Sequence, residues 1–440
     1  MYDAVVIGSG PGGYECARRV AESGGKAAII EKNSFGGTCT NSGCIPTKTL
    51  HASASLFSDA KREISSGFSV PLPSKYFKKM LEKKARVVRI MSKGVQKMLS
   101  DANVEMMLGE ARIKDRHTVA VSGQTLNAKN IVIATGAVPR MLPGLSLNDI
   151  VLTSTEMIEL KELPSSLIII GGGYIGCEFA SIFASLGVKV KMMEMMPSIL
   201  YNEDADISAE LARIMKRQDI EIFTSSKMLD INGNKVKFEH NKTEKYVEAD
   251  KILVAVGVEP YFNRSEMDNL RVKYGKGIIV NDKMQTSVEN IYAVGDVTDK
   301  IKLAHYAYAQ AQVAAKNIMG YEAEFDEATV PSAIFTIPEI SSVGVRNSEL
   351  KSAKFGFAEN GKARAMGEAD GFVKIYYEDG YLRGFCAIGP HASDLVAEVA
   401  LAIKNNIPLE KISGTIHAHP TLSEAFLGVV ERALKNNKGR

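Results

Sequence analysis

The N-terminal half of the chain alternates between short apolar runs, glycine-rich turns and amphipathic segments. An apolar run at residues 4–7 indicates a buried strand, and a glycine cluster follows it directly. A helical pattern extends from about Tyr14 to Glu22, and a second apolar run at residues 27–30 ends at Glu31. Strand, glycine turn, helix, strand and acid in this order are typical of a βαβ unit that binds a dinucleotide.

The glycine turn has the spacing that such a unit needs, because Gly8, Gly10 and Gly13 form a GxGxxG pattern. The first glycine permits a tight turn, the second lets the backbone approach a pyrophosphate, and the third lets helix and strand pack closely. The N-terminus of the helix then faces the negative charge of the phosphates. The pattern therefore predicts nucleotide binding at this turn.

The same arrangement occurs a second time. The four key residues recur at a constant offset of 163 residues, as Gly171, Gly173, Gly176 and Glu194. Two further similar segments, residues 131–136 and 252–257, close the two units at an offset of 121. A single GxGxxG pattern is weak evidence for nucleotide binding. Two copies, each with strand, helix and acid at equivalent positions, predict two nucleotide-binding modules. The offset between the two glycine fingerprints, 163, exceeds the offset between the two closing segments, 121, by 42 residues. The first module therefore carries an insertion of about 42 residues between its fingerprint and its closing segment.

The pattern changes again beyond the second module. An apolar run from residue 291 ends in Asp296, at the carboxyl end of a strand, where doubly wound sheets place ligand contacts. From about residue 330, short strands are followed by helical patterns at 393–405 and 421–434, which is typical of an α+β domain. We therefore predict an α/β fold with two duplicated Rossmann-like domains and a C-terminal α+β domain. The expected domains are 1–142 with 262–328, then 143–261, and finally 329–440.

Composition narrows the class of protein. The 440 residues are 45% hydrophobic and 24% charged, which excludes disordered and collagen-like chains. No run of about 18 apolar residues is present, so no membrane-spanning helix is expected. The net charge of +3 gives no reason to expect a nucleic acid or a membrane as partner. The first apolar run begins within a few residues of Met1, so no secretory or transit segment is expected and a cytoplasmic location is predicted.

Two of the five cysteines, Cys39 and Cys44, lie in the insertion with four residues between them. In a continuous helix this spacing does not align two side chains, but a distorted turn, helped by glycines and Pro46, could bring them within disulfide range. The alternatives are two unrelated buried thiols or half of a metal site. No metal is expected, because no further Cys/His pair stands nearby at ligand spacing. The remaining cysteines, expected to pack as small apolar side chains, are Cys16, Cys177 and Cys386.

His419 and Glu424 form a candidate pair of base and carboxylate near the C-terminus. Pro420 favours a helix that begins there, which would place Glu424 about one turn inside it. The carboxylate could then orient the imidazole and make it more basic, as a general base needs. A surface histidine beside a glutamate at a helix start is the alternative, and it is the commoner situation for an isolated histidine.

A strongly basic segment occupies residues 75–97, with nine Lys or Arg and one Glu. Its apolar residues recur at helical spacing, at Phe77, Met80, Leu81, Val88 and Met91. This pattern favours a packed helix with a solvated face. Docking onto an acidic partner is the main alternative, and nucleic acid binding is a minor one.

Two segments carry a resemblance to a known family: GGTCTNSGCIPTK at residues 36–48 and HAHPTLSE at residues 417–424. With the two glycine fingerprints, they resemble the flavin-dependent disulfide oxidoreductases over essentially the whole chain. The resemblance implies that the first module binds FAD, that the second binds a nicotinamide cofactor, and that the third domain forms a homodimer. The residues it assigns to FAD are Gly8, Gly10, Gly13, Glu31, Lys48, Gly136 and Asp296. Those it assigns to the nicotinamide side are Gly171, Gly173, Gly176, Glu178, Glu194 and Gly257.

The resemblance also implies a reaction. His419, held by Glu424, deprotonates a dithiol substrate, whose thiolate attacks Cys39 and opens a Cys39–Cys44 disulfide. Cys44 becomes the thiolate that lies against the flavin, and this division of labour is what thiol–disulfide exchange requires. The most similar branch of the family oxidises protein-bound dihydrolipoamide with NAD⁺. The expected partners are therefore a lipoylated acyltransferase or a glycine-cleavage carrier protein, and a second subunit whose cysteines face the histidine.

Glu194 predicts NAD rather than NADP. A carboxylate at this position accepts hydrogen bonds from a ribose 2′-hydroxyl and repels a 2′-phosphate. The nearby Lys189 and Lys191 fall on the other face of the strand. Val258 departs from the family, which usually has an arginine there in a Gly-Arg-x-Pro sequence. Two alternatives stay open: a related reductase similar to glutathione or mercuric reductase, and a flavoprotein without turnover that acts as a sensor or binding module.

Overall fold

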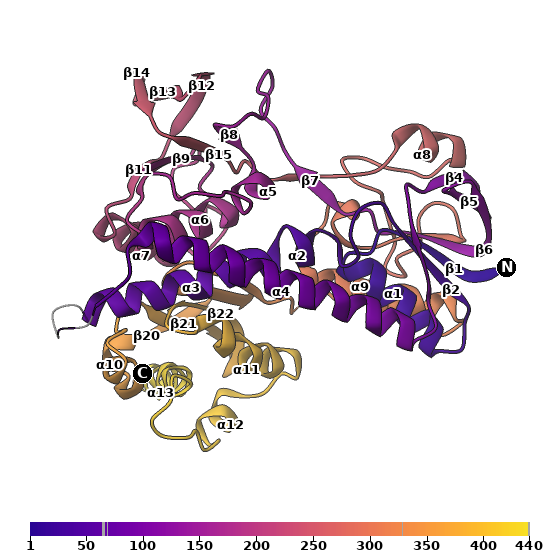
Figure 1. The fold of residues 1–440 in the computed structure, drawn as a ribbon. Helices are drawn as coiled ribbons and strands as arrows, with labels where there is room; N and C mark the ends of the chain where they lie inside the picture. The colour runs from indigo at the N-terminus through magenta and orange to yellow at the C-terminus, as the bar shows by residue number, and fades with distance from the viewer. Residues whose placement is uncertain (64–66, 68, 328, 439–440) are drawn as a thin grey trace.

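The computed structural model describes residues 1–63, 67, 69–327 and 329–438. Each glycine fingerprint follows a strand of a largely parallel sheet, and an antiparallel sheet forms the core of the C-terminal domain (Figure 1). The predicted limit of the first domain at residue 328 lies outside the described residues. Within the described residues, no helix is both long enough and apolar enough to cross a membrane.

The first sheet is built from the strands that the apolar runs predict. β1 (Tyr2–Ile7) pairs in parallel with β2 (Ala27–Glu31) and β6 (Gln124–Ile133), and β2 pairs with β3 (Glu105–Leu108). β17 (Ile291–Ala293) joins β6 in parallel, so a segment beyond the second module completes the first sheet. The antiparallel extension at the β6 edge consists of β4 (Arg112–Asp115) and β5 (Thr118–Val121).

Both faces of this sheet are buried. Val5 packs into one hydrophobic cluster and Val6 into another on the opposite face. α1 (Pro11–Glu22) and α9 (Ala304–Ile318) pack together over the second cluster. Burial on both sides explains why these strands read as continuous apolar runs and not as alternating ones.

The second module repeats this architecture. Its five parallel strands have the order β11-β10-β9-β15-β8, and helix α6 connects β9 to β10 behind the second glycine turn. A small antiparallel sheet, β12-β13-β14, is attached to it (Figure 1). The strands are β8 (Val151–Leu152), β9 (Ser166–Ile170), β10 (Lys189–Met193), β11 (Glu221–Phe223), β12 (Ser226–Asn232), β13 (Lys235–His240), β14 (Thr243–Glu248) and β15 (Lys251–Val254). The helices are α5 (Ser154–Met157), α6 (Tyr174–Ser185) and α7 (Ala205–Arg217).

Two short antiparallel strands carry the chain between the modules. They are β7 (Ala137–Pro139) and β16 (Val258–Pro260). Their flanking hydrogen bonds are reciprocal, because the Arg140 N–H donates to the Gly257 carbonyl at 3.0 Å and the Tyr261 N–H donates to the Gly136 carbonyl at 2.9 Å. The equivalent residues are 121 positions apart, so the internal repeat extends through both linkers. The chain then returns to the first module through α8 (Arg264–Leu270).

The insertion forms three helices that bridge the modules. They are α2 (Gly37–Asn41), α3 (Cys44–Arg62) and α4 (Pro73–Asp101). α3 packs against α4 and also against α6 of the second module. Phe77 of α4 meets Phe183 of α6 with the ring centroids 6.2 Å apart. The basic segment is therefore a packed amphipathic helix, as its pattern predicts.

The C-terminal domain is an antiparallel sheet, in the order β18-β19-β22-β21-β20, with helices packed on it. Its strands are β18 (Ser332–Ile334), β19 (Glu339–Gly344), β20 (Lys351–Gly356), β21 (Phe372–Glu378) and β22 (Tyr381–Gly389). Its helices are α10 (Gly361–Ala365), α11 (Ala392–Lys404), α12 (Leu409–Ser413) and α13 (Glu424–Lys438).

The prediction of a helix that begins at Pro420 is wrong, because α13 begins at Glu424. The Glu424 carboxylate accepts a hydrogen bond from the Thr421 N–H at 2.8 Å. This contact holds residues 421–423 in a turn before the helix, so Glu424 is the first helical residue and does not lie one turn inside.

Candidate active site

The first glycine turn is packed so tightly that only its middle glycine faces open space. Gly8 has a φ of +98°, and a Cβ there would lie 2.3 Å from the Ala134 carbonyl oxygen. A Cβ on Gly13 would lie 1.9 Å from the Gly8 carbonyl oxygen, whereas a Cβ on Gly10 would have no neighbour within 4 Å. The first and third glycines are therefore needed for the turn itself, and the second leaves room for a ligand.

The second turn repeats this geometry. Gly171 has a φ of +112°, and a Cβ there would lie 2.3 Å from the Ala255 carbonyl oxygen. A Cβ on Gly176 would lie 2.0 Å from the Gly171 carbonyl oxygen, and Gly173, like Gly10, faces open space. The two turns therefore offer equivalent backbone surfaces to a ligand.

The acid at the end of each unit is fixed beside its turn by backbone hydrogen bonds. Glu31 accepts from the Ser9 N–H at 3.0 Å and from the N–H two residues further along the chain at 2.9 Å. Glu194 accepts from the Gly172 N–H and from the N–H two residues further along, both at 2.6 Å. Each carboxylate keeps lone pairs free for a ribose hydroxyl.

A cavity of about 660 Å³ lies over the first turn. Its wall includes Gly8, Gly10, Glu31, Gly136, Asp296, Cys39 and Cys44. Five of the residues that the resemblance assigns to FAD therefore share one cavity with both candidate redox cysteines. Of the other two, Gly13 and Lys48, neither belongs to this wall, and Gly13 packs the turn from behind.

Asp296 enters this cavity from η2 (Gly295–Thr298), just beyond β17. Burial raises the pKa of its carboxyl, and the charge of Lys302 acts in the opposite direction. No side-chain hydrogen bond to this carboxylate occurs among the described residues, and an unpartnered carboxylate in a half-buried position favours a ligand that donates hydroxyl groups.

The two candidate redox cysteines lie on either side of a break between helices. α2 ends at Asn41, and α3 begins at Cys44 with Gly43 before it. The Asn41 amide fixes the end of α2, because it donates to two carbonyls of the preceding loop and to the Gly37 carbonyl of α2 at 2.9–3.2 Å. This is the distorted turn that the spacing requires, and it brings the two thiols into hydrogen-bonding contact.

Cys44 is the sulfur that is favoured as thiolate. A hydrogen bond from the Cys39 thiol lowers the pKa of Cys44 to about 7, and the charge of Lys48 also lowers it while burial opposes both. The same hydrogen bond, together with burial, raises the pKa of Cys39 well above its ordinary value. One sulfur therefore carries the negative charge while the other keeps its proton.

Lys48 and Glu178 form an ion pair between the redox helix α3 and helix α6 of the second module. Lys48 Nζ lies 2.8 Å from Glu178 Oε2 and 4.7 Å from the centroid of the Phe335 ring. Glu178 also accepts a hydrogen bond from the Phe335 N–H at 2.9 Å. Lys48, which the resemblance assigns to FAD, and Glu178, which it assigns to the nicotinamide side, thus meet where the insertion, the second module and the C-terminal domain come together.

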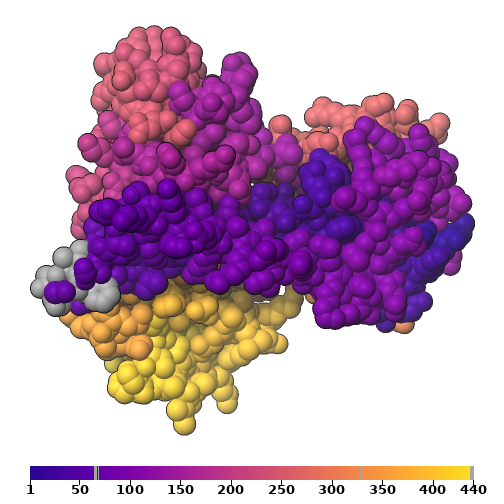
Figure 2. Space-filling model, in the orientation of Figure 1, coloured from indigo at the N-terminus to yellow at the C-terminus, as the bar shows by residue number. Residues whose placement is uncertain are grey.

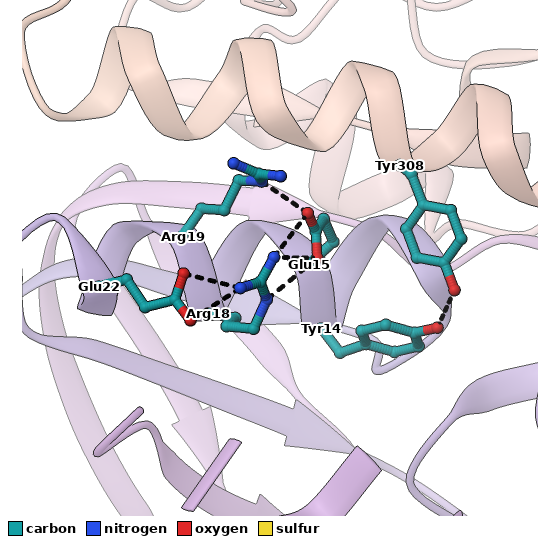
Figure 3. Close-up of polar contacts among 6 residues, drawn as sticks. All are labelled: Tyr14, Glu15, Arg18, Arg19, Glu22 and Tyr308. Atoms are coloured by element: carbon teal, nitrogen blue, oxygen red, sulfur yellow. Dashed lines mark hydrogen bonds and ion pairs between the residues drawn. The ribbon is translucent and has the colours of Figure 1, made fainter. Parts of the chain in front are cut away.

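Two tyrosines that sequence reasoning missed interact close to the redox pair. The hydroxyls of Tyr14 in α1 and Tyr308 in α9 share a hydrogen bond, and their rings meet edge to face with centroids 5.8 Å apart (Figure 3). Burial raises the pKa of Tyr308 and outweighs the hydrogen bond with Tyr14, which lowers it. The next residue of α1, Glu15, points another way and pairs with the two arginines Arg18 and Arg19 (Figure 3). No local pattern marks Tyr308, because it reaches Tyr14 only through the packing of α9 on α1.

His419 and Glu424 form the expected contact, with Nδ1 and Oε1 2.9 Å apart. A carboxylate only accepts hydrogen bonds, so the ring proton lies on Nδ1 and Nε2 is left as the basic atom. The His419 side chain is 78% exposed, and no described residue of the chain bonds its Nε2. The Thr421 N–H and then the His419 ring lower the pKa of Glu424. Within one chain, the structure brings His419 to Glu424 but not to Cys39 or Cys44.

The other three cysteines, Cys16, Cys177 and Cys386, are fully buried. Burial raises the pKa of each thiol, to about 12 for Cys16. The prediction that they pack as small apolar side chains is confirmed. In the described ranges, no group of three or more His, Cys, Asp or Glu side chains is placed to hold a metal ion.

Sequence comparison extends over nearly the whole chain. Residues 2–311 match the family described as pyridine nucleotide-disulphide oxidoreductase, and residues 330–429 match the dimerisation domain of that family. The dihydrolipoyl dehydrogenase of Geobacillus stearothermophilus is 38% identical to this chain over 98% of this chain and 96% of the relative. The dihydrolipoyl dehydrogenase of Bacillus subtilis (strain 168) is 37% identical over the same shares.

Solved structures give the same picture. The Cu(II) complex of the HOCl-induced flavoprotein disulfide reductase RclA from Escherichia coli superposes with a TM-score of 0.88 at 27% identity, covering 98% of this chain and 99% of that chain. LpdA (Rv3303c) from Mycobacterium tuberculosis superposes with a TM-score of 0.88 at 26% identity and the same coverage. These likenesses confirm the predicted α/β fold class with its C-terminal dimerisation domain.

Proposed function

The chain belongs to the pyridine nucleotide-disulphide oxidoreductase family, and from this premise we propose that it is a dihydrolipoyl dehydrogenase that passes electrons from dihydrolipoamide to NAD⁺. Membership makes it a flavoprotein disulfide oxidoreductase whose dimerisation domain supports a homodimer. The substrate and the nucleotide are the finer part of the proposal. The observation that carries it is the Cys39–Cys44 pair in the wall of the cavity above the first glycine turn.

The residues of this cavity fit FAD. The backbone at Gly10 is open to a pyrophosphate, Glu31 has lone pairs for a ribose, and Asp296 is a carboxylate without a side-chain partner among the described residues. When bound, FAD would take up the electron pair of the dithiol and deliver it as a hydride to the nicotinamide. Lys48 would stand beside it, held in an ion pair by Glu178, and would supply a positive charge near the Cys44 thiolate.

The thiol roles follow from the two protonation states. A substrate thiolate attacks Cys39, which breaks the Cys39–Cys44 bond, forms a mixed disulfide at Cys39 and releases Cys44 as a thiolate. Cys44 is suited to this role because its pKa is lowered to about 7. The second substrate thiol then attacks the substrate sulfur of the mixed disulfide, so the substrate leaves as a cyclic disulfide and Cys39 regains its thiol.

His419 of one subunit would serve the cysteines of the other. Its Nε2 takes the proton of the substrate dithiol, and Glu424 stabilises the imidazolium through Nδ1. The high exposure of the His419 side chain and its lack of contact with Cys39 in one chain both support a site completed by a homodimer. The proposed macromolecular substrate is a separate lipoylated acyltransferase or glycine-cleavage carrier protein.

Glu194 supports NAD⁺ over NADP⁺. Its carboxylate is held beside the second turn by the Gly172 N–H, so a 2′-phosphate would approach a fixed negative charge. Lys191 does not offset this charge, because its Nζ lies 3.7 Å from Glu221. If NADP⁺ supported turnover with a kcat/KM comparable to that of NAD⁺, this part of the proposal would be wrong.

The test is to mix dihydrolipoamide and NAD⁺ with the flavin-loaded protein and to follow NADH formation. We expect turnover in the wild type and none in Cys39→Ser, which should still bind FAD. Reduction of glutathione disulfide or Hg(II) by NADPH, without NADH formation from dihydrolipoamide, would instead assign a related reductase. Binding of both cofactors without turnover of any disulfide would assign a sensor or binding module.

A further inference from the structure

Helix α4 carries more cations than the acidic side chains of the described residues neutralise. The segment 75–97 has a net charge of +8 within a chain of net charge +3, so the remainder sums to −5. The ion pairs of this segment are Lys79–Glu82, Lys84–Glu159 and Lys97–Asp101. The cations without an acidic partner among the described residues are Lys75, Lys78, Lys83, Arg86, Arg89 and Lys93.

These six unpaired cations, called the α4 cation surface below, lie on one side of the helix. Lys75, Arg86 and Lys93 are spaced by 11 and 7 residues, which returns each of them to nearly the same direction on an α-helix. The opposite side is the packed one, where Phe77 is buried and Lys84 donates to the Ile158 carbonyl at 2.8 Å. Packing therefore explains one face of α4 but not the concentration of charge on the other. Figure 2 shows α4 open to solvent across the middle of the molecule, above the C-terminal domain.

A second cavity, of about 410 Å³, lies between this surface and Asn41 of the redox segment. Its wall includes Arg89, Lys93, Val88, Ser92 and Gln96 of α4, together with Asn41 and Glu159. Asn41 lies between the two redox cysteines in the sequence and also lines the first cavity, so it is part of both walls. The Ser92 hydroxyl donates to the Phe35 carbonyl at 2.9 Å and so fixes α4 to the loop before the redox helices. Arg89 and Lys93 therefore share a cavity wall with the residue that ends α2 between the two redox cysteines.

We propose that the α4 cation surface docks an acidic protein domain that carries the dithiol substrate, and that Arg89 and Lys93 hold this domain where its dithiol arm can reach Cys39. This inference rests on the proposed function, because it names the kind of carrier that would bring dihydrolipoamide. A neutral dithiol gains nothing from six unpaired cations, whereas an acidic carrier is attracted over roughly one Debye length, about 8 Å at physiological salt. Such complementarity raises association rates and selects the partner more than it raises the rate of the chemical step.

The test is the double variant R89E/K93E, because neither residue has a place in the proposed path of protons or electrons. The probes are an isolated lipoylated domain with a strongly negative net charge, the same domain with its exposed carboxylates changed to amides, and free dihydrolipoamide. We expect the KM for the acidic domain to rise about tenfold or more with kcat preserved. The KM for free dihydrolipoamide should stay within about twofold, and the amide domain should bind the wild type as weakly as the acidic domain binds the variant.

A matched control has the same charge change elsewhere. Lys227→Glu with Lys242→Glu reverses two exposed cations on the β12-β13-β14 sheet, and it should leave the KM for the acidic domain within about twofold. Raising the salt concentration should increase the KM of the wild type for the acidic domain and hardly change that of R89E/K93E.

Several outcomes would overturn the docking proposal. One is an unchanged KM for the acidic domain in R89E/K93E. Another is a shift of this variant from dimer to monomer in sedimentation, which would assign the surface to the subunit interface. A third is tight binding of an RNA oligonucleotide that only this variant loses, with no change in KM. Calorimetric binding of the oxidised acidic domain tests docking independently, because failure of dihydrolipoamide turnover would overturn the proposed function and leave this measurement intact.

Discussion

The two nucleotide modules share their fingerprint geometry down to single hydrogen bonds, yet only the first is covered by a redox helix. The residue after the first glycine of the turn makes the difference. Ser9 donates its hydroxyl to Glu31 at 2.7 Å and accepts the Gly36 N–H at 3.1 Å, so it joins the turn to the start of α2. The equivalent residue is Gly172, where a Cβ would lie 2.9 Å from the Ile199 side chain. The first module therefore has a side chain that binds the start of the insertion, and the second has a glycine at the equivalent position, where a side chain would crowd Ile199.

This comparison shows how a duplicated unit acquires two tasks. The phosphate-binding geometry depends on backbone conformation, so it survives duplication unchanged. The chemistry depends on side chains that are added around it. In the first module these are the redox pair and Asp296, whereas the turn of the second module keeps the acid and the open surface that both modules share.

The largest expected effects come from adding one methyl group to each turn. Gly8→Ala places a Cβ 2.3 Å from the Ala134 carbonyl at a φ of +98°, so we expect a protein purified without flavin. Gly171→Ala has the same clash at its own turn, so we expect flavin to remain bound while its reduction by NADH is lost. Flavin absorbance per protein and flavin reduction by NADH measure the two losses. Loss of flavin in both variants would show that the modules are not functionally separable.

A cysteine in each module sharpens the contrast. Cys44→Ser removes the sulfur that the electron path needs, so turnover should fall by at least about a thousandfold while FAD stays bound. Cys177→Ala in α6 removes a buried thiol that donates to the Gly172 carbonyl at 3.4 Å, and we expect a stability loss of about 1–2 kcal/mol with activity kept within about threefold. Steady-state assays and thermal unfolding followed by flavin release separate the two effects. Comparable losses of activity would argue against a special role for Cys44.

The pH dependence of the Cys44 thiolate is a subtler test. Its pKa is lowered to about 7, so the thiolate predominates above pH 7 and is lost as the pH falls through that value. In the two-electron-reduced protein, the long-wavelength absorbance of a thiolate beside flavin should therefore be halved near pH 7. Lys48→Met should move this midpoint upward, because it removes a positive charge that favours the thiolate. A wild-type midpoint at the ordinary thiol value of about 8.5 would contradict the assignment.

The smallest expected effect concerns Ser9. Ser9→Ala removes a buried hydroxyl that bridges Glu31 and α2, and the loss of such a hydrogen bond costs about 1–3 kcal/mol. Hydrogen exchange should become about tenfold faster or more for the amides of residues 36–41, with those of residues 171–176 unchanged. Equal acceleration of exchange in residues 36–41 and in residues 171–176 would mean that Ser9 stabilises the fold in general and does not specifically hold the start of α2.

Much of the fold could be predicted because its signals are local. Sheets buried on both faces produce continuous apolar runs, and GxGxxG turns tolerate no side chain at the first and third glycine. Because the unit is duplicated, the same pattern occurs twice in the chain. The start of α13 could not be read correctly, because a hydrogen bond from the Thr421 N–H to Glu424 decides it, and Pro420 suggested another position. The Tyr14–Tyr308 contact had no sequence signal, since the two residues are 294 positions apart.

The sequence alone determined the repeat, the two turns with their acids, the candidate redox cysteines and the family resemblance, because each depends on residues close together in the chain. Only the tertiary structure decided which groups meet across long separations. It placed Lys48 against Glu178 and directed the thiolate charge to Cys44. It also left the His419 side chain exposed, with no partner for its Nε2 in the described part of its own chain. It also showed that one face of the basic helix is packed while the other carries unpaired charge. Contacts and local fields arise from packing, and spacing along a chain does not encode them.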